Sequence, residues 1–281
     1  MKIKTSDYTV FHKSRAKKGI EYSVTQSARI GFDAVEVFDF ARPSQWMNSE
    51  KVIEMKKALS DNSLKLSCYS VHVNLLDEDV DDVVNRAFKH VEYASELGAP
   101  YFHHTIVPGL DFSRFVLGYD EVFERVIDNA IKIARKCNEY GIVCIYEPQG
   151  RYFNGFDGLK ALLSAVKAEG LNVGVCGDLG NSLFADCKPV DIFKEFSHDI
   201  KHIHVKDYRI CAERCEGAFV SRGGKYLVPV AVGEGDADVK GCLSYLKDYD
   251  GFLSFETEVD ENAVKKVVDM AEECFYGRKT F

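Results

Sequence analysis

The regular alternation of short strand-like runs with amphipathic, helix-like segments constrains the fold of this chain more than any other feature. Runs rich in β-branched or aromatic residues predict strands near residues 7–11, 34–38, 64–71, 101–106, 142–147, 172–178, 200–206 and 252–257. The segments between them carry apolar residues at helical spacing, most clearly in residues 120–140. Gly98, Gly141 and Gly170 fall where three of these helices should end.

Eight strands that alternate with helices predict a parallel sheet, and eight is the number that closes a barrel with a packed interior. The length of 281 residues fits one such domain. We therefore expect residues 1–281 to form a single α/β domain, a parallel eight-stranded (β/α)₈ TIM barrel. An open doubly wound sheet is the alternative, but no G-x-G-x-x-G opens a helix, so its dinucleotide-binding form has no support. The connection over residues 208–236 is unusually long, as active-site lids often are.

Composition narrows the class of partner and the compartment. The formal net charge of −8 argues against non-specific binding to nucleic acid, which depends on Lys and Arg side chains against phosphates. Nine cysteines occur without a C-x-x-C pair, and no apolar leader or long apolar run is present. We expect a cytoplasmic protein that binds neither nucleic acid nor membrane. A homo-oligomer stays possible.

Four titratable residues come at or near the ends of the last four predicted strands: Glu147, Asp178, His204 and Glu256. Side chains alternate between the two faces of a strand, and the apolar neighbours of these residues predict that all four point into the barrel. Active sites of such barrels form at this end. Each residue alone is more often structural than a ligand, but three converging carboxylates repel one another unless a cation is present. The set therefore predicts one divalent metal ion, Mn²⁺, Mg²⁺, Co²⁺ or Zn²⁺.

The same alternation places other polar residues. Glu36 is expected to point into the barrel, where a buried carboxylate needs a partner. His103 and His104 are adjacent, so at most one of them is expected to point inward. His72 follows the third strand and is a candidate for substrate contact. Lys206 is expected to bind a substrate oxygen or to form a salt bridge with Glu36 or Asp207.

Four stretches carry a resemblance to a known superfamily. They are YEPQG around Glu147, VGVCGDLGN around Asp178, IKHIHVKD around His204 and LKDYDGFLSFETE leading to Glu256. With them the chain resembles the xylose-isomerase-like barrels, which include sugar isomerases, epimerases and endonuclease IV. The resemblance implies the same four metal ligands, with Glu147 and Glu256 as an acid–base pair.

Three positions depart from the ketose 3-epimerases of that superfamily. Asn181 stands where they have a His, Phe153 where they have a second Glu, and Ile210 where they have an Arg, with Arg209 beside it. We therefore expect different substrate contacts, among them His72, Asn181, Lys206 and Arg209.

The resemblance implies a metal-dependent isomerase or epimerase of a small sugar, ketose or related polyol, which moves a proton through an enediolate between the two glutamates. A metal-dependent dehydratase of the inosose or dehydroshikimate type is the alternative. An endonuclease IV-like nuclease and a non-catalytic sugar-binding barrel are weaker alternatives. The expected partner is a small sugar or polyol.

Overall fold

Eight parallel strands close into a barrel in the computed structural model, which describes residues 2–41, 45–109, 117–247 and 249–277. Each strand pairs with the next along the chain, and the first pairs with the last. The barrel strands are β1 (Lys4–Asp7), β2 (Ala34–Phe40), β3 (Lys65–His72), β4 (Tyr101–His104), β5 (Val143–Tyr146), β6 (Val173–Asp178), β7 (Ile200–Val205) and β11 (Phe252–Phe255). The predicted fold class, a parallel eight-stranded (β/α)₈ TIM barrel, is confirmed.

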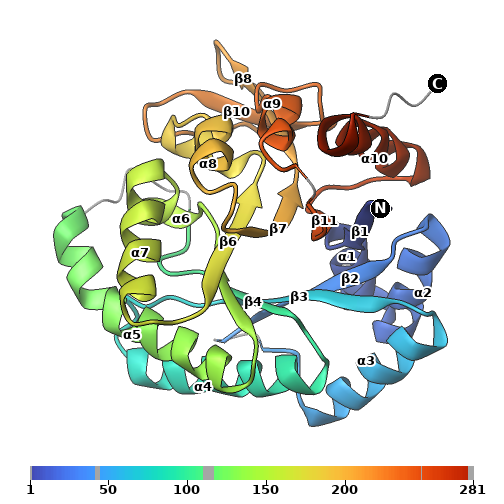
Figure 1. The fold of residues 1–281 in the computed structure, drawn as a ribbon, viewed down its shortest axis with the longest axis horizontal. Coiled ribbons are helices and arrows are strands. Elements are labelled where there is room, and N and C mark those ends of the chain that lie inside the picture. The colour runs from blue at the N-terminus through green and yellow to red at the C-terminus, as the bar shows by residue number, and fades with distance from the viewer. Residues whose placement is uncertain (1, 42–44, 110–116, 248, 278–281) are drawn as a thin grey trace.

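Helices surround the barrel and bury their apolar faces against it (Figure 1). They are α1 (Thr9–Lys18), α2 (Ile20–Ile30), α3 (Ser49–Asp61), α4 (Val80–Glu96), α5 (Tyr119–Glu139), α6 (Gly150–Phe153), α7 (Phe156–Ala168), α8 (Pro189–Glu195), α9 (Val239–Ser244) and α10 (Glu261–Tyr276), with the 3₁₀ helix η2 (Asn181–Ala185). Among the described residues, no helix is both long and apolar enough to cross a membrane. The three glycines predicted to end helices all have positive φ, between 71° and 73°, a conformation that other residues adopt at a cost.

The first strand differs from its prediction. Residues 7–11 were expected to be a strand, but β1 ends at Asp7 and α1 begins at Thr9. The Asp7 carboxylate accepts the backbone N–H of Val10 at 2.9 Å, which stabilises the turn into the helix. The apolar run was therefore read with the wrong period: Phe11 is buried on a helix face.

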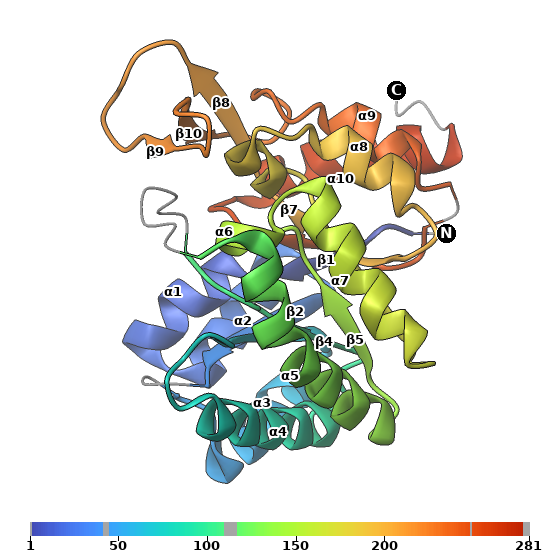
Figure 2. The ribbon, with the colours of Figure 1, turned by 90° about the vertical axis from the view of Figure 1, so that its left-hand side faces the viewer.

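The long connection after β7 forms a small antiparallel sheet rather than an irregular loop. Its strands β8 (Asp207–Cys211), β9 (Phe219–Val220) and β10 (Tyr226–Val230) pair in the order β8-β10-β9. Figure 2 shows them projecting from one end of the molecule, beyond α6 and α8. The buried carboxylate of Asp207 anchors the return of the chain, because it accepts the backbone N–H groups of Gly233 and Gly235, each at 2.9 Å.

Candidate metal centre

The four predicted ligands come together at the carboxyl ends of neighbouring strands. Glu147 directly follows β5, Asp178 ends β6, His204 lies near the end of β7, and Glu256 directly follows β11. One ligand atom from each lies within 4.8 Å of every other. His204 Nδ1 faces all three carboxylates, at 2.9 Å from Glu147, 3.2 Å from Glu256 and 3.9 Å from Asp178. The strand alternation inferred from sequence therefore places these side chains correctly.

Lys206 lies among the same carboxylates. Its ammonium group is 2.6 Å from Glu256 and 3.0 Å from Asp178, and only 7% of its side chain is exposed. Burial disfavours the ammonium form, but Asp178 and Glu256 raise the pKa of Lys206 well above its usual value. The predicted salt bridge to Glu36 or Asp207 is wrong. Lys206 follows the end of β7 and reaches across the mouth, whereas Glu36 lies deeper and Asp207 binds backbone N–H groups.

The side chain of Glu147 is fully buried. Its Oε1 accepts a hydrogen bond from the Asn181 amide at 2.9 Å, while Asn181 also donates its backbone N–H to Asp178. Glu147 Oε2 is buried and finds no hydrogen-bond donor among the described residues; His103 Nε2, also without a partner there, lies 3.4 Å away. A buried carboxylate oxygen without a donor is costly, and a bound cation removes that cost.

The two glutamates occupy different electrostatic environments. Burial raises the pKa of Glu147 to about 8, although His204 opposes that shift. Burial also acts to raise the pKa of Glu256, but Lys206 and His204 outweigh it and lower this pKa to about 2. The side chain of Glu256 is 23% exposed and that of Glu147 is not exposed. Glu256 therefore lies on the open side of the cluster and Glu147 on the closed side.

The donor set fits a divalent metal ion. Three carboxylates and one imidazole suit the oxygen-preferring ions Mg²⁺ and Mn²⁺, and Zn²⁺ or Co²⁺ also accept such ligands. The unpartnered oxygen of Glu147 points to the same conclusion. The cluster supports a divalent metal, and the donors do not select one ion.

The other predicted substrate contacts lie at different distances from this cluster. Asn181 belongs to it through Glu147. His72 ends β3 and packs against the Phe40 ring at 5.1 Å between centroids. Arg209 is exposed on β8 and donates to the carbonyl of Glu234 at 2.8 Å. Their contact with substrate remains a prediction.

Sequence reasoning missed one aromatic neighbour and left another contact undecided. The Tyr8 ring lies 5.7 Å from the His204 ring, between centroids. It was missed because the first strand was predicted to run to residue 11, so Tyr8 was not recognised as the residue that directly follows the end of β1. Of His103 and His104, His103 points inward to Glu147, whereas His104 packs on Tyr146. That confirms the expectation that at most one points inward.

Fold and site together define a TIM barrel with a metal-ligand cluster at the carboxyl ends of its strands. The chain belongs to the xylose isomerase-like TIM barrel family, whose model matches residues 24–274. It is 22% identical to an inosose dehydratase of Bacillus cereus (strain AH820) over 263 residues, which cover 87% of this chain and 84% of that protein.

Solved structures share the whole fold. A xylose isomerase-like TIM barrel protein from Mycobacterium smegmatis in complex with magnesium superposes with a TM-score of 0.73 at 14% identity, covering 97% of each chain. The IOLI protein with a binding zinc atom gives a TM-score of 0.71 at 16% identity, covering 98% of this chain and 100% of that one. The fold of this chain is thus shared with barrels that bind divalent metals.

Proposed function

We propose that this protein is a divalent-metal-dependent isomerase or epimerase of a small sugar, ketose or related polyol. The observation that carries the proposal is the pair of carboxylates, Glu147 and Glu256, which lie 2.9 Å and 3.2 Å from His204 Nδ1 in one cluster of potential metal ligands. A divalent ion bound there supplies Lewis acidity, which makes the C–H bond next to a carbonyl group more acidic.

Two residues of the chain then carry out the two halves of the proton transfer. Glu256 is partly exposed at the open side and removes the proton from the carbon beside the carbonyl. Glu147 lies on the closed side and returns a proton at the neighbouring carbon or on the opposite face. Asn181 holds Glu147 in place through its amide, at 2.9 Å. Lys206 offers a positive charge to a substrate oxygen that gains negative charge.

A dehydratase is the second candidate, and two observations favour it. The inosose dehydratase of Bacillus cereus matches along nearly the full chain. The Lys206 ammonium beside Glu256 is also placed to protonate a departing hydroxyl group after the same first proton abstraction. The two candidates share every residue of the first step and differ in whether the product loses water.

Mass spectrometry in D₂O tests both. The full chain, loaded with Mn²⁺ or Mg²⁺, is incubated with ketoses and with inososes, and the molecular mass of each product is measured. Incorporation of deuterium at unchanged composition supports an isomerase or epimerase, while loss of one water supports a dehydratase. Glu256→Gln should abolish exchange while metal still binds, and Glu147→Gln should abolish exchange and weaken metal binding. Lys201→Met, on the same strand as His204 but outside the cluster, serves as the matched control.

Two results would contradict the proposal. One is a wild-type chain that binds no divalent metal at any concentration tested. The other is full exchange activity in Glu147→Gln, which would show that the two-glutamate mechanism is wrong.

A further inference from the structure

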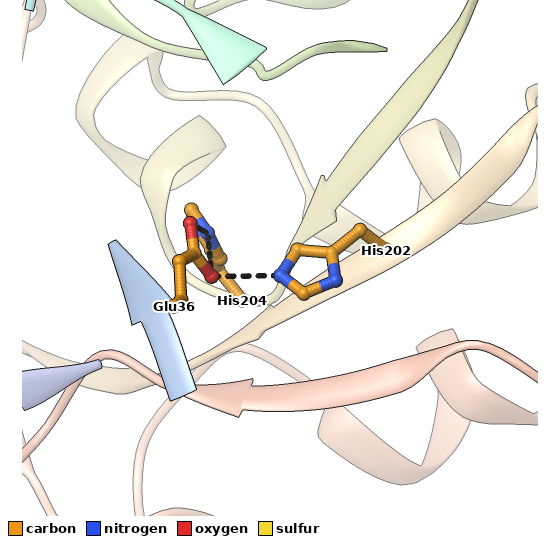
Figure 3. Close-up of side chains that lie close together, drawn as sticks. All are labelled: Glu36, His202 and His204. Atoms are coloured by element: carbon orange, nitrogen blue, oxygen red, sulfur yellow. Dashed lines mark hydrogen bonds and ion pairs between the residues drawn. The ribbon is translucent and has the colours of Figure 1, made fainter. Parts of the chain in front are cut away.

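A second polar cluster lies directly beneath the metal ligands and is centred on Glu36 of β2. Glu36 is fully buried. Its carboxylate accepts hydrogen bonds from Ser70 and Ser254, each at 2.6 Å, and from His202 Nε2 at 2.7 Å. His204 Nε2 lies 3.1 Å and 3.2 Å from its two oxygens. Figure 3 shows both imidazoles of β7 turned toward this one carboxylate.

Packing alone does not explain a charge at this depth. The neighbouring layer of the barrel interior is apolar, made of Cys68, Ile145 and Cys176. A buried carboxylate is expensive unless donors satisfy it, and here donors from β3, β7 and β11 do so. Strand pairing sets Ser254 beside His204, so the barrel register itself brings these donors together.

The contact with Glu36 decides which nitrogen of His204 is available to a metal. A carboxylate accepts hydrogen bonds and does not donate them, so His204 Nε2 must carry the hydrogen. Nδ1 faces the carboxylates of Glu147, Glu256 and Asp178, so without a metal it carries a hydrogen as well. A cation bound among those carboxylates would displace the Nδ1 hydrogen, and Nδ1 would then offer its lone pair while Nε2 keeps its hydrogen.

We propose that Glu36 is a positioning residue that holds His204 in the Nε2–H tautomer and so presents Nδ1 to the metal. The inference rests on the proposed metal-dependent function. Glu36 touches neither the metal nor the substrate. His202 and the two serines fix the carboxylate so that it keeps this orientation.

Glu36, His202 and His204 also each bring one potential ligand atom within 4.8 Å of the other two. Their facing atoms are instead engaged in hydrogen bonds of 2.7 Å to 3.2 Å with one another, and both serine hydroxyls add to the carboxylate. The proposal therefore requires one metal ion per chain, and a measured ratio of two would overturn it.

The test titrates Co²⁺ into the metal-free full chain and follows its visible absorption and the heat of binding. Glu36→Gln keeps the size of the side chain but gives up one of the two acceptor oxygens, and should weaken Co²⁺ binding about 10- to 100-fold. Glu36→Asp, which retains the carboxylate, should restore part of that loss. Ser254→Ala removes a donor to Glu36 without touching His204, and should change the affinity less than about fivefold, the value of one ordinary hydrogen bond.

A measurement on the unaltered chain covers the case in which Glu36 variants do not fold. In the Zn²⁺-loaded protein, ¹⁵N–¹H correlation spectra report which imidazole nitrogen of His204 is protonated, with His204→Gln identifying the signal. Hydrogen on Nε2 is expected, and hydrogen on Nδ1 overturns the inference. If the wild-type chain binds no metal, the proposed function fails; if it binds metal but Glu36→Gln binds as tightly, only the role of Glu36 fails.

Discussion

Replacement of Lys206 by Met tests whether this ammonium neutralises the carboxylates that a metal would otherwise neutralise. The ammonium lies 2.6 Å from Glu256, 3.0 Å from Asp178 and 4.0 Å from Glu147. Methionine keeps much of the length and apolar surface of the lysine stem and removes the ammonium group, with its charge and its hydrogen bond to Glu256. In the metal-free chain, Lys206→Met would leave the carboxyl groups of Glu147, Asp178 and Glu256 with only the imidazole of His204 among them.

The expected cost follows from burial. Removing one partner of a buried ion pair costs about 3–5 kcal/mol, and we take the lower end because Glu256 is 23% exposed and can turn toward water. With about 2.1 cal/mol/K of unfolding entropy per residue, a chain of 281 residues loses about 5 °C in Tm for that free energy. When metal saturates the site, its charge replaces that of the ammonium, and the loss should fall to about 2 °C or less.

Differential scanning fluorimetry with and without Mn²⁺ measures both losses. Lys201→Met is the matched control, because its ammonium binds a backbone carbonyl outside the cluster, and both of its forms should stay near the wild-type Tm. Metal affinity of Lys206→Met should rise, since ammonium and metal compete for the same oxygens. Equal losses of Tm with and without metal would refute the reasoning.

Three further predictions concern stability and the connection after β7. Gly150→Ala should lower the free energy of unfolding by about 2 kcal/mol or more, because its φ is +75° and a Cβ there would overlap the carbonyl oxygen of Val107. Gly170 is the control, because its φ is +72° but a Cβ there would touch no neighbour. In urea unfolding, Gly170→Ala should lose only about 1 kcal/mol. Burial lowers the pKa of His90 to about 4, so between pH 6.5 and 4 the unfolded chain binds a proton that the folded chain does not. As the pH is lowered through this window, the free energy of unfolding should fall by up to about 1.4 kcal/mol per pH unit. His90→Gln should show a shallower dependence on pH. Asp207→Ala should release the β8–β10 sheet and speed its cleavage by trypsin while metal binding persists, so unchanged proteolysis would count against Asp207 as its anchor.

The clustering of the four candidate ligands could be predicted because it depends on local patterns. Strand alternation decides which side chains point inward, and parallel order decides that strand ends meet, so Glu147, Asp178, His204 and Glu256 followed from the chain itself. Choosing the partner of Lys206 required the depth of each side chain along the barrel axis. That depth depends on strand stagger, including the register shifts in β2 and β6, which no short pattern encodes.

The network around Glu36 was out of reach for a similar reason. Its inward direction followed from alternation, but its donors come from β3, β7 and β11, which are distant in sequence. The β8–β10 sheet was missed because its strands are only two to five residues long and partly exposed, which is too short for a clear hydrophobic periodicity.

The pairing of β1 with β11 has a consequence for how the protein is made. During synthesis, β1 emerges first and its free edge finds β11 only after residues 252–255 leave the ribosome. Glu256 follows that strand directly, so the last residue of the cluster arrives with the strand that closes the barrel. A chain truncated before β11 has two open sheet edges and lacks Glu256 from the cluster. If the cluster binds the proposed metal, binding would mark the completion of folding and would favour closed barrels over the aggregation-prone open form.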